Sequence, residues 1–159
     1  MIKVQEEDFD IGAELAALSA GDTSIGAVAS FTGVVRDMAP IEGESHNIRT
    51  MTLEHYPGMT EKKLAEIEAE ANERWPLAAS LIIHRYGTLA PGDRIVFVAC
   101  ASAHRQAAFD ACQFVIDWLK TEAPFWKLEE TDGGGVWVDA RESDDQAAAR
   151  WNKANDTST

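Results

Sequence analysis

The chain has 159 residues, of which 45% are hydrophobic and five are tryptophan, so it is long enough to bury the core of one domain without disulfides or a structural metal. Its 14 Lys and Arg stand against 27 Asp and Glu, which gives a net charge of -13. Because affinity for nucleic acids and for anionic membrane surfaces comes largely from Lys and Arg, this balance argues against both as partners.

No stretch reaches the roughly 20 apolar residues that span a membrane, and the first residues, MIKVQEEDFD, lack the apolar core of a signal peptide. We therefore expect a soluble, cytoplasmic protein. Cys100 and Cys112 lie in apolar runs without CxxC spacing, which predicts buried free thiols. The histidines are scattered and form no HExxH motif, so we predict neither a metal nor a cofactor.

Hydrophobic periodicity and turn residues predict a succession of strands and helices. In chain order we expect a strand at 2–4, a helix from about 8 or 10 to 19, strands at 26–35 and 48–56, a helix at 60–75, strands at 81–86 and 94–101 that form a hairpin, a long helix capped by Ser102 and ended by Pro124, a hairpin of 126–130 with 136–140, and a short helix at 144–151. This order favours an α+β fold with a mainly antiparallel sheet.

Two segments lack periodicity. The segment 37–46, DMAPIEGESH, is polar and contains Pro and Gly, so we expect a mobile loop beside Arg36 that could act as a lid. The polar residues 152–159 are expected to form a disordered tail that follows a single domain at 1–151.

The stretch from Ser102 to Glu129 is unusual because it gathers cationic side chains around one apolar helix of an acidic protein. His104 and Arg105 fall at the start of that helix. Free backbone N–H groups and the positive end of the helix dipole already favour an anion there, and phosphate is the natural ligand. The alternative is an exposed pair that merely follows the helix cap.

Lys120 and Lys127 flank Pro124, one at the end of the helix and one in the segment that leaves it. The chain reversal could bring both amines to one pocket. Two ammonium groups held close together are each easier to deprotonate, and a neutral lysine can act as general base, general acid or nucleophile. The alternative is two solvated lysines.

Helix length separates these two groups of cations. Arg105 and Lys120 are fifteen positions apart, which is about 22 Å along a helix at 1.5 Å per residue. Side chains of one subunit cannot close that gap. Either there are two sites, or a symmetric dimer brings the two ends together, and we favour the composite site because such a dimer forms two of them.

Six motifs along the chain are informative together, although each is weak alone. They are GAVASFTGVVRD at 26–37, LEHYPGMTEKKLAEI at 53–67, RWPL at 74–77, HRYGTLAPGD at 84–93, SAHRQAAF at 102–109 and LKTEAPFWKLE at 119–129. In these motifs, and over nearly all of residues 25–151, the chain resembles the catalytic large subunit of molybdopterin synthase.

The resemblance implies a sulfurtransferase of molybdenum cofactor biosynthesis. Its substrate would be cyclic pyranopterin monophosphate, and its sulfur would arrive as a thiocarboxylate on the C-terminal tail of a small ubiquitin-like subunit. The resemblance also implies an α/β hammerhead-like fold with a small additional antiparallel sheet. The expected assembly is a heterotetramer in which two large subunits form a homodimer with one small subunit at each far end.

The resemblance extends to individual residues. Lys120 and Lys127 match the pocket lysines beside the inserted tail, and we expect both to be catalytic, with Lys120 as the acid/base. Arg36, His104 and Arg105 match residues that hold the pterin phosphate.

Further residues follow from the same resemblance. Backbone around Val34–Val35 and Leu128–Glu129 is expected to complete the pocket, and Arg141 to add a cation. Val34 and Leu128 stand where relatives often carry a basic residue, which implies a less positive pocket and weaker substrate binding.

Two alternative functions remain open at this point. One is a non-catalytic scaffold that binds a ubiquitin-like tail. The other is an unrelated phosphoester-binding enzyme that uses His104 as general acid. Neither accounts for Lys120 and Lys127 together with the family motifs.

Overall fold

The computed structural model describes residues 1–36, 38–41, 44–131, 133–138 and 142–152. Nine strands and four helices lie within them. In chain order these are β1 (Ile2–Gln5), α1 (Ile11–Ser19), β2 (Ala27–Val34), β3 (Met38–Ile41), β4 (Glu44–His55), α2 (Met59–Arg74), β5 (Leu77–Arg85), β6 (Gly87–Leu89), β7 (Arg94–Ser102), α3 (Arg105–Glu122), β8 (Phe125–Thr131), β9 (Gly134–Val138) and α4 (Glu142–Ala149).

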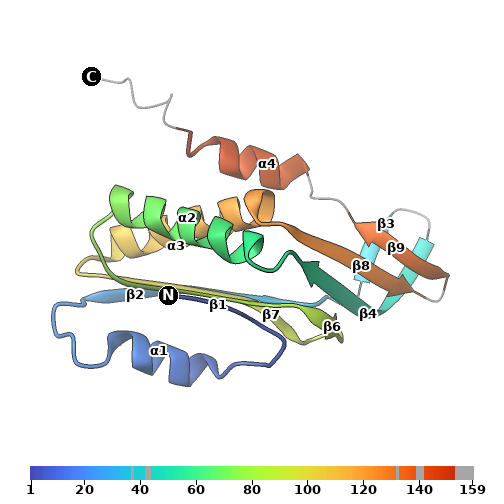
Figure 1. Cartoon of the computed structure of the whole chain (residues 1–159), viewed down its shortest axis with the longest axis horizontal. Coiled ribbons are helices and arrows are strands. Elements are labelled where there is room, and N and C mark those ends of the chain that lie inside the picture. The colour runs from blue at the N-terminus through green and yellow to red at the C-terminus, as the bar shows by residue number, and fades with distance from the viewer. Residues whose placement is uncertain (37, 42–43, 132, 139–141, 153–159) are drawn as a thin grey trace.

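The larger part of the molecule is a four-stranded sheet with helices on both faces (Figure 1). Its strand order is β1-β5-β7-β2. β1 runs parallel to β5, and the other neighbours are antiparallel. Figure 1 shows α1 below this sheet and α2 and α3 side by side above it, with α4 as a further layer beyond them.

Strand β7 is apolar on both faces because it lies in the middle of these layers. Val98 and Cys100 belong to the core shared with α2 and α3, whereas Phe97 and Ala99 belong to the core shared with α1. All four are fully buried. The continuous apolar run IVFVACA therefore reflects a strand covered on both sides.

The second sheet is entirely antiparallel and lies beside the first, at the right of Figure 1. Its order is β3-β4-β8-β9, and β6 also pairs with β4. One face buries a small cluster that includes Met51 and Leu53. On the other face Trp126 and Trp137 are 46% and 55% exposed. This sheet is therefore packed on one face only.

Helix α3 begins later than the sequence predicted. Ser102, the expected N-cap, is the last residue of β7, and its buried hydroxyl donates a hydrogen bond to the Pro76 carbonyl at 2.8 Å. The N-cap is His104, whose side chain makes no capping hydrogen bond. For α1 the sequence offered Asp8 or Asp10 as the cap. The cap is Asp10, whose carboxylate accepts from the Ala13 N–H at 2.9 Å.

The prediction of a loop at 37–46 is wrong for most of that segment. Residues 38–41 form β3, and β4 already begins at Glu44, so the two strands form an antiparallel pair. Pro40 is compatible with this arrangement because β3 is an edge strand, where a missing N–H need not break the sheet. Residues 37, 42 and 43 lie outside the described part.

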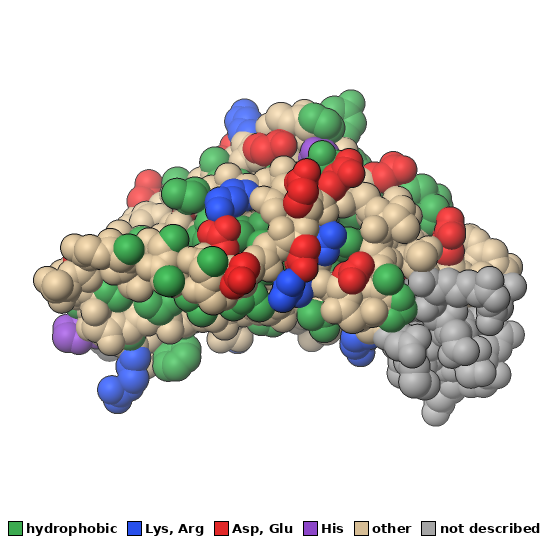
Figure 2. Space-filling model, turned by 90° about the horizontal axis from the view of Figure 1, so that it is seen from below, with side chains coloured by type: hydrophobic (Ala, Val, Ile, Leu, Met, Phe, Trp, Pro, Cys, Tyr) green, Lys and Arg blue, Asp and Glu red, His purple; other side chains and the backbone are tan. Residues whose placement is uncertain are grey.

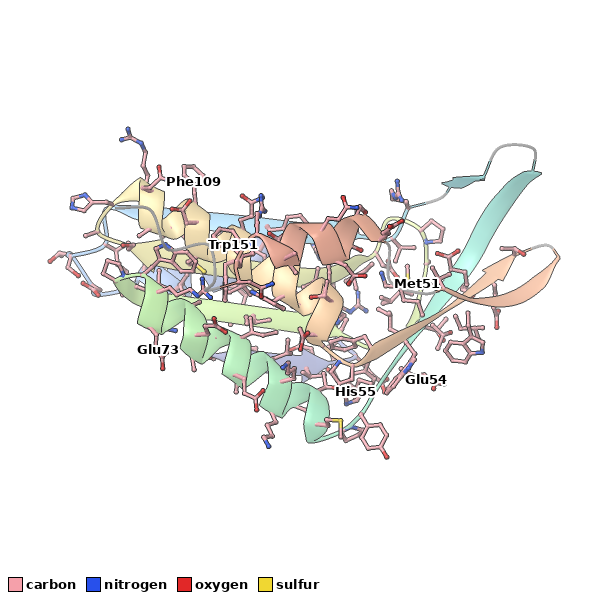
Figure 3. The ribbon with its side chains drawn as sticks, turned by 90° about the horizontal axis from the view of Figure 1, so that it is seen from above. Met51, Glu54, His55, Glu73, Phe109 and Trp151 are labelled. Atoms are coloured by element: carbon pink, nitrogen blue, oxygen red, sulfur yellow. The ribbon has the colours of Figure 1, made fainter. Side chains whose placement is uncertain are left out.

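Helix α4 is fastened to α3 by a buried carboxylate. Asp117 of α3 is 9% exposed and accepts hydrogen bonds from Arg150 and from the Trp151 indole N–H, the latter at 2.7 Å. The Trp151 ring also packs edge-on against Trp75 and Phe114, each with ring centroids 5.6 Å away. Figure 3 shows Trp151 over the layer of helices. These contacts hold the C-terminal end of α4 against α3.

The expected α+β class, with a mainly antiparallel sheet and an additional antiparallel sheet, is confirmed. None of the described helices is long and apolar enough to cross a membrane. The cytoplasmic location and the single domain at 1–151 remain predictions. Most of the expected tail, residues 153–159, lies outside the described residues.

Candidate functional site

A cavity of about 530 Å³ opens where the two sheets meet. Its walls come from the end of β2, the last turn of α3, the strand β8 and the first turn of α4. Among the described residues, the charged side chains that line it are Arg36, Lys120, Lys127, Glu129 and Asp144. Three cations thus face two carboxylates in a chain with a net charge of -13, so the cavity is suited to an anionic ligand.

The turn between α3 and β8 brings Lys120 and Lys127 to this cavity. Lys120 is in the last turn of α3, and Lys127 is the third residue of β8. Between them, the carbonyl of Pro124 accepts a hydrogen bond from the hydroxyl of Thr60 at 3.2 Å. Thr60 is fully buried in α2, so the reversal is held from inside the protein. The expected convergence of the two amines is therefore present.

Arg36 lines the same cavity as the two lysines. It lies two residues after the end of β2, beyond a register irregularity at Gly33 and Val34, and Val34 lines the cavity as well. Val35 between them is 2% exposed. Its N–H donates to the Asp93 carbonyl at 2.9 Å and its carbonyl accepts from the Gly92 N–H at 2.8 Å. Val35 thus anchors the segment while its neighbours face the cavity.

Strand alternation divides the residues of β8 between two faces. Lys127 and Glu129 line the cavity, and Leu128 points the other way because successive side chains of a strand face opposite sides. There it packs over Gly135, where a β-carbon would lie 3.3 Å from Leu128 Cδ1. Leu128 is therefore not a cavity-lining side chain, and a basic residue at this position would also point away from the cavity.

His104 and Arg105 do not line the cavity. Both are exposed and lie at the N-terminal end of α3, whereas Lys120 is in its last turn. The helix runs without interruption over Arg105–Glu122, so the separation expected from its length holds within one subunit. The structure groups Arg36 with the lysines and leaves His104 and Arg105 apart. Arg141 lies outside the described residues.

Two wall residues were not expected from the sequence as site residues. His84, at the end of β5, and Phe125, at the start of β8, both line the cavity. Their rings are stacked, with centroids 3.6 Å apart and an interplanar angle of 15°. His84 is the first residue of the HRYGTLAPGD motif, but a single histidine after an apolar strand carries no local signal that it faces a cavity.

A second hollow, of about 450 Å³, lies near the start of α1 beside Asp8 and Arg94. The two side chains form an ion pair there, and this pairing lowers the pKa of Asp8 to about 2. Because its cation is already neutralised, this hollow is less suited to an anion than the cavity between the sheets. Figure 2 shows acidic side chains interleaved with a few basic ones on the α1 side.

The cysteines are unsuited to catalysis. Both are buried free thiols, as expected, and burial raises the pKa of Cys100 to about 12 and that of Cys112 to about 11. Neither forms the thiolate that a nucleophile requires near neutral pH. Among the described residues no group of three or more His, Cys, Asp or Glu could hold a metal ion.

Comparison with known proteins places the chain in a family. Residues 4–122 match the family model described as MoaE protein. A molybdopterin synthase catalytic subunit of Pseudomonas aeruginosa is 58% identical over 150 residues, which are 94% of this chain and 97% of that protein. A protein of the same name from Ralstonia nicotianae is 56% identical over 158 residues, 99% of this chain and 88% of that protein.

A solved structure agrees with the sequence matches. The molybdopterin biosynthesis MoaE protein of Burkholderia ambifaria superposes with a TM-score of 0.80 at 54% identity, over 95% of this chain and 97% of that one. The similarity therefore spans both sheets and the cavity between them. From the family match, the extent of these identities and the shared fold, we conclude that this chain belongs to the MoaE family, which includes catalytic subunits of molybdopterin synthase.

Proposed function

We propose that this chain is the subunit of a molybdopterin synthase that transfers sulfur to cyclic pyranopterin monophosphate and so forms the dithiolene. The observation that carries the proposal is the meeting of Lys120, Lys127 and Arg36 in one cavity, in a chain of the MoaE family. Ammonium and guanidinium groups that meet at one anion-binding site favour the binding of both a thiocarboxylate and a phosphate ester.

The two lysines serve the sulfur donor. Their ammonium groups stabilise the thiocarboxylate at the end of an inserted tail while its sulfur displaces an oxygen substituent of the pterin side chain. Water then cleaves the acyl C–S bond of the resulting thioester, so the sulfur stays on the pterin and the tail leaves as a carboxylate. Lys120, at the end of a helix that is packed into the core over most of its length, acts as the acid/base. A positioned proton donor or acceptor of this kind contributes typically 10²–10⁴-fold to a rate.

The phosphate is held by cations, with Arg36 in the cavity itself. His104 and Arg105 contribute from a second copy of the chain, because about 22 Å of helix keeps them from the lysines of their own subunit. Two symmetric sites then form at the interface of a homodimer. Charge-assisted contacts of this kind contribute roughly 1.5–3 kcal/mol each.

The sulfur comes from a partner protein rather than from this chain, since both cysteines are buried with raised pKa values. The relatives are named catalytic subunits, which is consistent with an assembly that contains another kind of subunit. We propose that this partner is a small ubiquitin-like protein with a thiocarboxylated C-terminus. Two sulfur transfers then require two loaded partners for each product.

The test is reconstitution. The purified chain is mixed with cyclic pyranopterin monophosphate and a thiocarboxylated small subunit, and the dithiolene product is followed by fluorescence after oxidation. Product is expected with the thiocarboxylate, and none with the same small subunit ending in an ordinary carboxylate. A stable complex without product would favour the scaffold, and phosphate release without a sulfur donor would favour an unrelated phosphoester-binding enzyme.

A further inference from the structure

His84 is a wall residue of the cavity that the proposed sulfur transfer does not use. It is the last residue but one of β5 and lies on the same face of that strand as Ile82, which packs in the core beneath α2 and α3. The residue is 5% exposed. Burying a polar ring costs free energy unless its nitrogen atoms make hydrogen bonds, so the partners of both nitrogens need to be identified.

The hydrogen bond of its Nδ1 fixes the tautomer of His84. Nδ1 lies 2.8 Å from the carbonyl oxygen of Arg85, and a carbonyl oxygen can only accept, so Nδ1 carries the proton. In the neutral ring Nε2 then holds a lone pair. The stacked ring of Phe125 covers one face of the imidazole. With one face covered and Nδ1 turned to its own strand, the edge left for the cavity carries Nε2.

His84 lines the cavity, and the hydrogen bond found for it uses Nδ1. Nε2 is therefore the ring nitrogen that remains for a bound molecule.

The imidazole is uncharged at neutral pH. Burial lowers the pKa of His84 from 6.5 to about 4, although the hydrogen bond to Arg85 opposes the shift. The positive charge of Lys127, on β8 of the second sheet, and His55 of β4 lower it further. His84 thus offers the cavity a hydrogen-bond acceptor without a charge, unlike the carboxylates of Glu129 and Asp144.

We propose that His84 is a substrate-binding residue whose Nε2 accepts a hydrogen bond from an N–H group of the bound pterin. This inference rests on the proposed function, which supplies the pterin. Arg36, Lys120 and Lys127 attract the phosphate and the thiocarboxylate, whereas a lone pair repels both anions. The N–H groups of the heterocycle are the complementary donors, so His84 orients the ring system while the cations hold the charged ends.

Two variants separate this role from mere packing. His84→Phe keeps an aromatic ring stacked on Phe125 and removes the acceptor. His84→Gln loses the stack but places an amide oxygen near the position of Nε2. If His84 only fills space, His84→Phe resembles the wild type and His84→Gln is the more damaging change. If it binds the pterin, the order is reversed.

The experiment measures the affinity of the wild-type and variant chains, each in complex with the small subunit in its carboxylate form, for cyclic pyranopterin monophosphate by calorimetry. We expect His84→Phe to weaken binding about fivefold to tenfold, the size of one lost hydrogen bond, and His84→Gln to remain within about threefold. Lys62→Ala is the control, because Lys62 is exposed on α2 and is not a lining residue of the cavity, and it should bind like the wild type. Affinity for the small subunit should not change in any variant.

Wild-type affinity for His84→Phe would overturn the inference, as would equal losses in both variants. Failure of the wild-type complex to bind the pterin would instead overturn the proposed function and this inference with it. A second measurement needs no variant and no ligand: ¹⁵N spectra of labelled histidine in the free chain should show an unprotonated Nε2 from pH 6 to 8. A proton on Nε2 would refute the proposal.

Discussion

The two sheets of this protein differ in how they are covered, and the difference separates stability from function. The four-stranded sheet has helices on both faces, and its central strand β7 is buried on both sides (Figure 1). The second sheet buries one face over a small cluster and exposes Trp126 and Trp137 on the other. The cavity lies at their junction, where Arg36 after β2 and Lys120 of α3 meet Lys127 of β8.

This arrangement means that the core and the site can be changed separately. The strands and helices of the first sheet carry most of the buried apolar area, so substitutions there should act on stability. The three cations at the junction, Arg36, Lys120 and Lys127, are exposed and contribute little to packing, so their substitution should act on the reaction. Figure 3 labels two residues of β4, Met51 and Glu54. They belong to opposite faces of the second sheet because they are three positions apart on one strand.

The largest effect is expected at the junction. Lys120→Ala should lower turnover by roughly 10²–10⁴-fold, equivalent to about 3–5 kcal/mol, because it removes the proposed acid/base. Unfolding temperature and affinity for the small subunit should stay near wild type, since Lys120 is exposed. Lys62→Ala, on the exposed side of α2, is the matched control. Near-normal turnover by Lys120→Ala would refute its catalytic role.

A pair of aromatic substitutions compares the two sheets directly. Phe97→Ala removes a fully buried ring that packs 5.8 Å from Phe9 and should lower the free energy of unfolding by about 3–5 kcal/mol. Trp137→Ala removes a larger ring that is 55% exposed. It should change the free energy of unfolding of the isolated chain by only about 0.5 kcal/mol. Urea denaturation measures both. Equal losses would mean that the second sheet is as tightly packed as the first.

The pH dependence of stability should report on His84, which joins the two sheets. Its pKa is about 4 in the folded chain and 6.5 ordinarily, so between these values the unfolded chain binds a proton that the folded chain does not. The free energy of unfolding should therefore fall as pH falls from about 6.5 to about 4, by up to roughly 3 kcal/mol. His84→Gln should lack this contribution. Parallel pH profiles for both chains would contradict the shift.

A smaller effect is expected where α4 is fastened to α3. Asp117→Ala removes the acceptor for Arg150 and the Trp151 indole and should lower stability by about 1–3 kcal/mol. Because Ser143 and Asp144 of α4 line the cavity, turnover should also fall. Hydrogen exchange measures the loosening of α4.

The control for Asp117→Ala is Asp110→Ala on the same helix. Asp110 accepts a hydrogen bond from Gln106 at 2.9 Å on the surface, and its loss should leave α4 protected. Unchanged protection of α4 in Asp117→Ala would show that the aromatic contacts of Trp151 hold the helix by themselves.

Local signals were sufficient for most of the elements. Apolar periodicity placed one helix at 60–75 and another between Ser102 and Pro124, and Asp10 marked the start of a helix. The hairpin of 126–130 with 136–140 is present, although its second strand already begins at Gly134. Local signals failed at 38–41, where a loop was expected and a strand is present, and at Ser102, which is not the cap of α3. A short edge strand owes its pairing to β4 rather than to its own residues, and the Ser102 hydroxyl is used by a distant carbonyl, that of Pro76.

By itself, the sequence determined the α+β class, the pair of lysines around Pro124, the wide separation of Arg105 from Lys120, and the family. Each follows from residues that are close along the chain, from the fixed rise of a helix, or from motifs. Only the tertiary structure decided that Arg36 joins the lysines, that Leu128 faces away from them, and that His84 lies in the wall of the cavity. These facts depend on strand register and on the meeting of two sheets, which bring together residues far apart in the chain, and no local pattern encodes them.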